Sequence, residues 1–249
     1  MIADPLFWAA ALPAVLVFGI SKGGFGTGLG ILAVPLMALA IPPAQAAAIM
    51  LPTLLVMDFA SVWAWWGRGD RALLRLLLPA GLLGTAIGTL AFRTVSAAHL
   101  KLALGAIAVW FVLIRVLARP SRREKAPPSR PKGAFWATVS GLTSFIAHAG
   151  GPPMSIYLLP LRLEPAVLMG VTSVFFAAMN WAKVLPYGWL GLYSAENLVT
   201  AAALAPVGLA GVGLGVWLHR RVDPALFYRL AYAFLLVTGT KLLYDGLRA

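Results

Sequence analysis

The stretch Gly19-Ile-Ser-Lys-Gly-Gly-Phe-Gly-Thr-Gly-Leu-Gly30 holds six glycines and one lysine inside an apolar run from Pro5 to Pro42. That run is longer than the roughly 20 residues that one membrane helix needs. Glycine costs about 1 kcal/mol per residue against alanine in a helix interior, so we expect the run to break near Lys22–Gly26. A break exposes backbone N–H groups, which favour anions, and it survives in lipid only inside protein or beside a cavity. We therefore predict that this stretch forms half of a transport site.

A second stretch of the same kind lies in the other half of the chain, Ser144-Phe-Ile-Ala-His-Ala-Gly-Gly-Pro-Pro153. It belongs to an overlong apolar run over residues 133–161, whose place corresponds to that of residues 6–40. Interrupted apolar segments in corresponding positions of two halves indicate a transporter binding site. We expect the two breaks to supply the two sides of one site.

The composition predicts an all-α polytopic membrane protein. Of the 249 residues, 61% are hydrophobic and only 11% are charged, whereas about 25% are charged in soluble domains. No alternating pattern of ten-residue strands is present, which argues against a membrane barrel. The net charge of +12 collects in a few loops, as membrane orientation requires, and does not indicate a nucleic-acid partner. The sequence has no cysteine and three widely spaced histidines, so we predict no metal site and no cofactor.

A basic, proline-rich linker divides the chain into two membrane repeats. The linker, residues 119–132, separates residues 1–118 from residues 133–249. The apolar segments lie at 6–40, 44–66, 74–92, 98–118, 133–161, 166–189, 197–218 and 225–244. At an offset of 127, the residues Pro79, Gly81, Gly84, Gly88, Arg93 and Val95 recur as Pro206, Gly208, Gly211, Gly215, Arg220 and Val222. Their glycines are expected to let helices pack closely in lipid.

Loop charges predict that the two repeats are inverted. If the linker is cytoplasmic, the arginine-rich loop 67–75 also lies inside. In the second half, loop 187–196 has one acidic and no basic residue and belongs outside, whereas the basic loop 219–229 belongs inside. Each repeat then begins with a broken or hairpin segment followed by three transmembrane helices. The basic loop 93–101 on the outside is a violation of the rule, and eight plain spans with parallel halves are the rival topology.

Four ionisable residues lie deep in apolar segments, where a charge costs about 2.5–3.5 kcal/mol on insertion scales. Lys22 would bind a small oxyanion or extend to the membrane surface. His148 would carry a proton or bond to a freed carbonyl. Asp58, which corresponds to Asn180 at an offset of 122, would take a proton or form an ion pair with Lys22 or Lys183. Lys183 is expected to extend to the outer surface, because Pro186 and Tyr187 follow it.

The predicted substrate-binding set combines these groups with nearby glycines and hydroxyls: Lys22, Gly23, Gly24, Gly26, Thr53, Ser144, His148, Gly150, Gly151, Pro152 and Asn180. Asp58 and His148 are the candidates for proton coupling, and no residue is assigned to catalysis. Aromatic residues are expected to form interfacial belts: Trp63, Trp65, Trp66, Tyr187 and Trp189.

The chain resembles the TauE/SafE sulfite-exporter type permeases, also called the toluene-sulfonate uptake permease (TSUP) family. The resemblance rests on the glycine-rich segment through Gly28 with Val34-Pro-Leu36, on its counterpart from Gly141 to Leu161, and on the central linker. It implies a carrier of the bacterial inner membrane that is coupled to an ion gradient such as protons. Its substrates would be sulfite, organosulfonates such as sulfoacetate, and related anions. Lys22 and His148 match no family-wide motif, and Pro152-Pro153 stands where the first half has Thr27-Gly28.

We therefore predict a secondary transporter, an exporter of small sulfur-containing anions that works by alternating access and is not an enzyme. The expected partners are that anion and the lipid bilayer. Assembly into a homo-oligomer is left as an open alternative. The alternatives are a carrier or channel for another small anion, or a membrane scaffold without transport.

Overall fold

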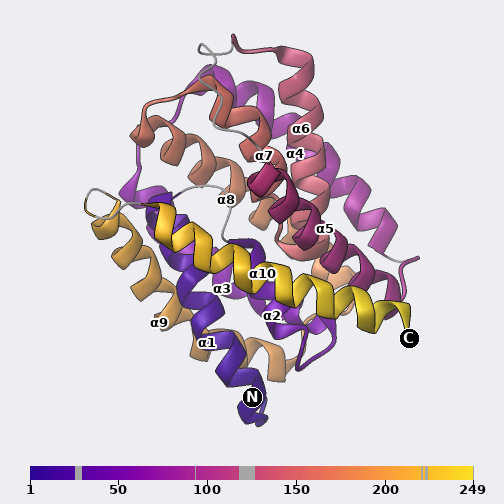
Figure 1. Ribbon diagram of the computed structural model, residues 1–249. Coiled ribbons are helices and arrows are strands. Elements are labelled where there is room, and N and C mark those ends of the chain that lie inside the picture. Colours follow the sequence, from indigo (N-terminus) through magenta and orange to yellow (C-terminus); the bar gives the residue numbers. More distant parts are fainter. Residues whose placement is uncertain (26–29, 93, 118–126, 220, 222–223, 249) are drawn as a thin grey trace.

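The computed structural model describes residues 1–25, 30–92, 94–117, 127–219, 221 and 224–248. These residues form helices joined by turns and contain no strand (Figure 1). The helices are α1 (Pro5–Ile20), α2 (Ala33–Met37), α3 (Pro43–Ala64), α4 (Arg71–Phe92), α5 (Ala97–Leu117), α6 (Arg130–Ala147), α7 (Gly151–Leu158), α8 (Pro165–Trp189), α9 (Ala195–Leu218) and α10 (Pro224–Leu247). Five of them are long and apolar enough to cross a membrane: α1 with the turn that follows it, α3, α4, α8 and α9. The prediction of an all-α polytopic membrane protein is confirmed.

Local sequence signals set the helix ends. Helices α1, α3 and α8 begin with proline, whose fixed φ suits the first helical position and whose missing N–H is not needed there. Asp4 caps α1 by accepting from the Leu6 N–H, and Ser194 caps α9 by accepting from the Asn197 N–H. Helix α6 begins at Arg130, so the end of the predicted linker is helical, and residues 118–126 lie outside the described ones.

Both overlong segments are interrupted, as predicted. In the first, α1 passes into a π-helical turn over Ser21–Phe25, and a 3₁₀ turn over Gly30–Leu32 leads into α2. In the second, α6 ends at Ala147 and α7 begins at Gly151. His148 caps α6 in the left-handed conformation with φ 51°, which turns the chain away from the helix axis.

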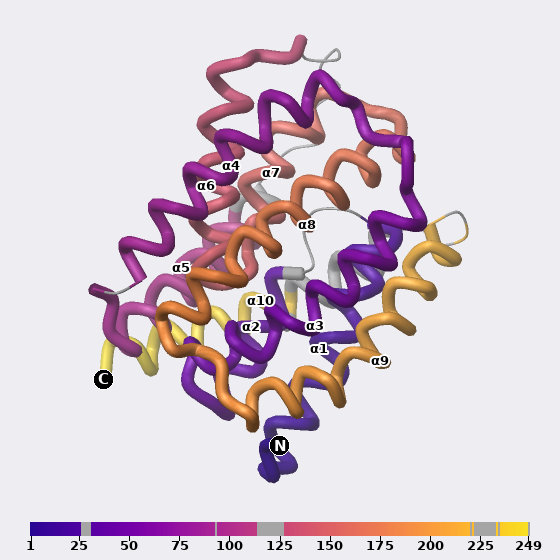
Figure 2. Tube along the Cα trace, turned by 180° about the vertical axis from the view of Figure 1, so that it is seen from behind, coloured from indigo at the N-terminus to yellow at the C-terminus, as the bar shows by residue number. Residues whose placement is uncertain are grey.

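Glycines bring helices from different halves into backbone contact. A Cβ built on Gly24 would lie 1.9 Å from the Gly215 carbonyl oxygen of α9, and one on Gly141 of α6 would lie 2.0 Å from the Gly81 carbonyl oxygen of α4. These contacts hold α9 against α1 and its π-helical turn, and α6 against α4 (Figures 1 and 2). The predicted small-residue faces of α4 and α9 are therefore helix interfaces.

The remaining long helices pair across the two halves in opposite directions. Helices α3 and α8 run antiparallel, since Asp58 lies against Asn180 while the later Ser61 lies against the earlier Ser173. Helices α5 and α10 lie side by side on one face of the molecule (Figure 1). They are also antiparallel, because Gly105 packs on Gly239 and the earlier Leu102 packs on the later Gly246.

The apolar core is divided into two clusters. One is formed mainly by α1, α2, α3, α5, α9 and α10, and the other by α4, α6, α7 and α8. The crossing of α3 with α8 lies between these clusters, and Figure 2 shows both helices in the middle of the bundle. Polar side chains of this crossing are therefore enclosed by apolar packing.

Candidate functional site

The crossing of α3 and α8 brings two corresponding polar residues together. Asn180 Nδ2 donates to Asp58 Oδ2 at 2.7 Å, and both side chains are buried. One turn along α3, the hydroxyls of Ser61 and Ser173 are 2.7 Å apart. Asn180, predicted from the internal repeat alone, therefore lies at the centre of a polar cluster.

Lys22 reaches this cluster from the first break. Its Nζ lies 2.5 Å from Asp58 Oδ1, and the lysine and aspartate side chains are 7% and 1% exposed. The carbonyl of Lys22 accepts from Ser61 Oγ at 3.0 Å, which fixes the π-helical turn on α3. Of the two partners considered for Asp58, Lys22 forms the ion pair, and it does not extend to the membrane surface.

His148 and Lys183 meet at the second break. His148 Nδ1 is 2.9 Å from Lys183 Nζ, and its Nε2 is 3.0 Å from the Ala47 carbonyl oxygen. When the lysine is protonated it donates to Nδ1, so the histidine is neutral with its proton on Nε2 and donates to Ala47. Lys183 also donates to the carbonyl oxygen and the hydroxyl of Ser144, each at 3.0 Å.

The expectation that Lys183 extends to the outer surface is wrong. Its side chain is fully buried, because α6 covers it and its Nζ contacts Ser144 of that helix. Tyr187 likewise does not belong to an aromatic belt: it is fully buried, and its hydroxyl donates to the Phe145 carbonyl oxygen at 2.8 Å. Trp63, Trp66 and Trp189 are mostly exposed, as an interfacial belt requires.

The buried charges of the described residues do not balance. Two lysines, Lys22 and Lys183, stand with one carboxylate, Asp58. No carboxylate among the described residues lies within ion-pair distance of Lys183. An unpaired charge in the interior is strongly unfavourable, so a second negative group is needed whenever Lys183 is protonated. The arrangement is chemically suited to hold one small anion.

The glycines of the first break are placed by packing. A Cβ on Gly23 would lie 2.1 Å from the Val212 carbonyl oxygen, so a larger residue would push α9 away. The carbonyl of Gly23 accepts from Trp65 Nε1 at 2.9 Å, and His219 Nδ1 contacts the carbonyl of Gly24. Gly26, also predicted for the site, lies outside the described residues.

The other predicted residues divide into near and distant groups. Gly150 and Gly151 begin α7, but Pro152 and Pro153 follow and lack N–H groups, so this helix offers few donors to an anion. Ser144 belongs to the lysine cluster. Thr53 donates to the Ile49 carbonyl oxygen of its own helix at 3.1 Å and takes no part in that cluster.

Sequence reasoning missed Ser61, Trp65, Lys183 and Tyr187 as site residues, although a signal for them exists. At the offset of 122 that joins Asp58 to Asn180, Ser61 corresponds to Lys183 and Trp65 to Tyr187. Each residue of these pairs bonds to the break in its own half. Together with Asp58 and Asn180 they make three corresponding pairs, which lie on one face of each helix at spacings of three and four residues.

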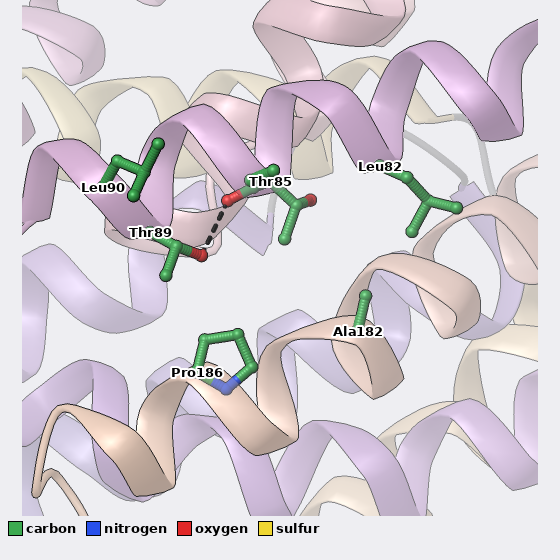
Figure 3. Close-up of a pocket in the computed structure, with 7 residues that line it drawn as sticks. Leu82, Thr85, Thr89, Leu90, Ala182 and Pro186 are labelled. Carbon is green, nitrogen blue, oxygen red and sulfur yellow. Dashed lines mark hydrogen bonds between the residues drawn. The ribbon is translucent and has the colours of Figure 1, made fainter.

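An apolar groove of about 410 Å³ lies between α4 and α8, and none of the residues of the polar cluster lines it (Figure 3). Thr85 and Thr89 line it, but Thr89 Oγ1 donates to the Thr85 carbonyl oxygen at 2.9 Å and Thr85 Oγ1 donates to that of Gly81 at 3.1 Å. Its hydroxyls are therefore engaged with the helix backbone, and an anion would find no charge-bearing partner there.

No curated protein and no solved structure matches this chain. A family profile described as Sulfite exporter TauE/SafE matches residues 11–242, which is nearly the whole chain and both broken segments. That family consists of membrane transporters and not enzymes. The chain belongs to the sulfite exporter TauE/SafE family.

Proposed function

We propose that this protein is a secondary transporter of small sulfur-containing anions such as sulfite or an organosulfonate, and that it exports them across a bacterial inner membrane. The observation that carries the proposal is the pair of buried lysines at the crossing of α3 and α8: among the described residues, Lys22 has a carboxylate within ion-pair distance and Lys183 has none. A small anion held there would balance the charge of protonated Lys183, and it would accept charge-assisted hydrogen bonds from Lys22.

Alternating access is supported by how the helices pair. The corresponding helices α3 and α8 cross antiparallel, as do α5 and α10, while α1 with α9 and α4 with α6 form equivalent pairs. Two inverted repeats, residues 1–118 and 133–249 joined by a cytoplasmic linker, would produce these relations. Rocking of one repeat against the other around the central cluster would then open it to each side in turn.

Binding to the purified full chain in detergent tests the proposal first. Sulfite, thiosulfate, sulfoacetate, taurine, sulfate and acetate are compared for the concentration-dependent rise in melting temperature that a ligand of the folded state produces. We expect a sulfur-containing anion to give the largest rise. The double variant Lys22→Met/Asp58→Asn removes the ion pair without changing net charge, and we expect it to weaken binding at least tenfold. If no anion raises the melting temperature, the proposal is wrong.

Reconstitution in liposomes distinguishes the alternatives. A carrier exchanges labelled anion and shows saturation, whereas a channel passes anion without saturation, and a scaffold shows no flux above empty liposomes. Unchanged binding in the double variant would give the Lys22–Asp58 pair a structural role and move the anion site elsewhere.

A further inference from the structure

Lys183 is the buried charge that has no partner of opposite sign. Its side chain has no exposed surface, and among the described residues no carboxylate pairs with it, whereas Lys22 lies 2.5 Å from Asp58. A buried ammonium without a counter-ion is unfavourable enough that such a group gives up its proton. Lys183 therefore has two favourable states, neutral in an empty site and charged beside an anion.

The atoms around Lys183 Nζ suit both states. The charged form donates its three protons to the Ser144 carbonyl oxygen and hydroxyl, each at 3.0 Å, and to His148 Nδ1 at 2.9 Å. The neutral form has two N–H groups and one lone pair. The Ser144 hydroxyl can then rotate and donate to that lone pair, while the carbonyl and Nδ1 still accept. Neither state leaves a polar atom without a hydrogen bond.

The surrounding groups keep their own partners in both states. The titratable groups around Lys183 are Lys22 of the π-helical turn, Asp58 of α3, His148 after α6 and Tyr187 of its own helix. Lys22 and Asp58 neutralise each other, and the Tyr187 hydroxyl donates to a backbone carbonyl. His148 Nε2 stays bonded to the Ala47 carbonyl oxygen. A change of protonation therefore falls on the Lys183–His148 pair, which titrates as a unit.

We propose that Lys183, held by His148 and Ser144, is the proton-coupling residue of the transporter: one proton enters this pair with each bound anion and leaves with it. The inference rests on the proposed function. The empty centre carries the Lys22 ammonium, the Asp58 carboxylate and neutral Lys183 and His148, and so has no net charge. On loading, a buffer acid or hydronium ion of the solution on the open side transfers a proton to Nζ as the anion arrives, and its conjugate base stays in that solution. A univalent anion thus crosses with its proton as a neutral pair.

Calorimetric titration of the full-length protein measures this proton directly. Methanesulfonate and sulfoacetate serve as probes in Tris and in bicine, two buffers that lack sulfonate groups and differ in ionisation enthalpy. We expect uptake of about one proton per anion, and therefore an affinity that falls roughly tenfold per unit of rising pH. Lys241→Met, which removes an exposed lysine paired with Asp245 on α10, is the matched control and should keep both properties.

Two variants separate coupling from folding. Lys183→Arg keeps the charge in a group that does not lose its proton, so binding should persist with no proton uptake and no pH slope. Lys183→Met should lose anion binding by at least tenfold, with the melting temperature reporting its fold. Anion binding without proton uptake in the unmodified protein, or an unchanged pH slope in Lys183→Arg, would overturn the coupling role alone. Absence of any anion binding by the unmodified protein would overturn the proposed function and this inference with it.

Discussion

The two breaks meet in one cluster but hold their charges differently. At the first break, Lys22 forms an ion pair with Asp58, so its charge is balanced within the protein. At the second, Lys183 has only the neutral partners Ser144 and His148 among the described residues. The difference comes from corresponding positions in the sequences of the two halves: Asp58 corresponds to Asn180, and Ser61 corresponds to Lys183. Single side chains thus leave the lysine of one break with a carboxylate partner and the lysine of the other with none among the described residues.

Making the two breaks alike should have the largest effect. Asp58→Asn gives the first half the residue of the second and leaves Lys22 and Lys183 buried without a carboxylate. Breaking a buried pair from one side costs about 3–5 kcal/mol, and we expect a correspondingly lower melting temperature in detergent. Adding Lys22→Met should recover much of the loss, because the orphaned charge is then gone. A double variant as unstable as Asp58→Asn would show that the ion pair does not govern stability here.

Substitution of glycines tests a feature that the two halves share, the close backbone contact of α9 with α1 and of α4 with α6. A Cβ at Gly215 would lie 2.2 Å from the Ile20 carbonyl oxygen, and one at Gly84 would lie 1.9 Å from that of Thr138. Gly215→Ala and Gly84→Ala should each destabilise the protein by about 1–3 kcal/mol through overpacking. Gly213→Ala on the same helix meets nothing within 4 Å and should change stability by less than about 0.5 kcal/mol. A large effect in one half only would mean that the two interfaces are not equivalent.

The helical framework could be predicted because its causes are local. Runs of apolar residues, the first-turn prolines and the concentration of glycine determine where helices start and break, and those signals need no knowledge of distant neighbours. The change from α-helix to a π-helical turn at Ser21–Phe25 falls within the glycine-rich stretch. The pairing of Asp58 with Asn180 was also visible, because the repeat carries spatial information along the chain.

The depth of Lys183 and Tyr187 was not predictable from local rules. Both residues lie near the outer end of the predicted segment 166–189, where lysine and aromatic side chains usually reach the membrane surface. In the structure α8 ends at Trp189, as that segment does, but α6 covers both side chains. The glycines of the first break pose a similar difficulty: their density predicts irregular backbone, but only the packed structure shows that α9 occupies the space beside Gly23 and Gly24. Tertiary contacts decide these roles.

The smallest expected effects compare the side chains that anchor each break. Tyr187 donates to the Phe145 carbonyl oxygen and is fully buried, whereas Trp65 donates to that of Gly23 and is half-buried. Tyr187→Phe should cost about 1 kcal/mol, the net worth of a buried hydrogen bond. Trp65→Phe should cost less for its hydrogen bond, because water can replace the indole N–H at a partly exposed position. Melting temperatures of both variants in detergent measure the difference.

The double variant then asks whether the two breaks behave as one unit. The two anchors share no partner, so their effects should add within about 0.5 kcal/mol if the breaks are independent. Trp65 and Tyr187 each fix one break to the α3–α8 pair. If one repeat rocks against the other, both hydrogen bonds would therefore be strained at the same time, and the effects of the two substitutions would not be independent. A coupling well above 0.5 kcal/mol, with both single variants folded, would therefore favour concerted movement of the two breaks over independent opening.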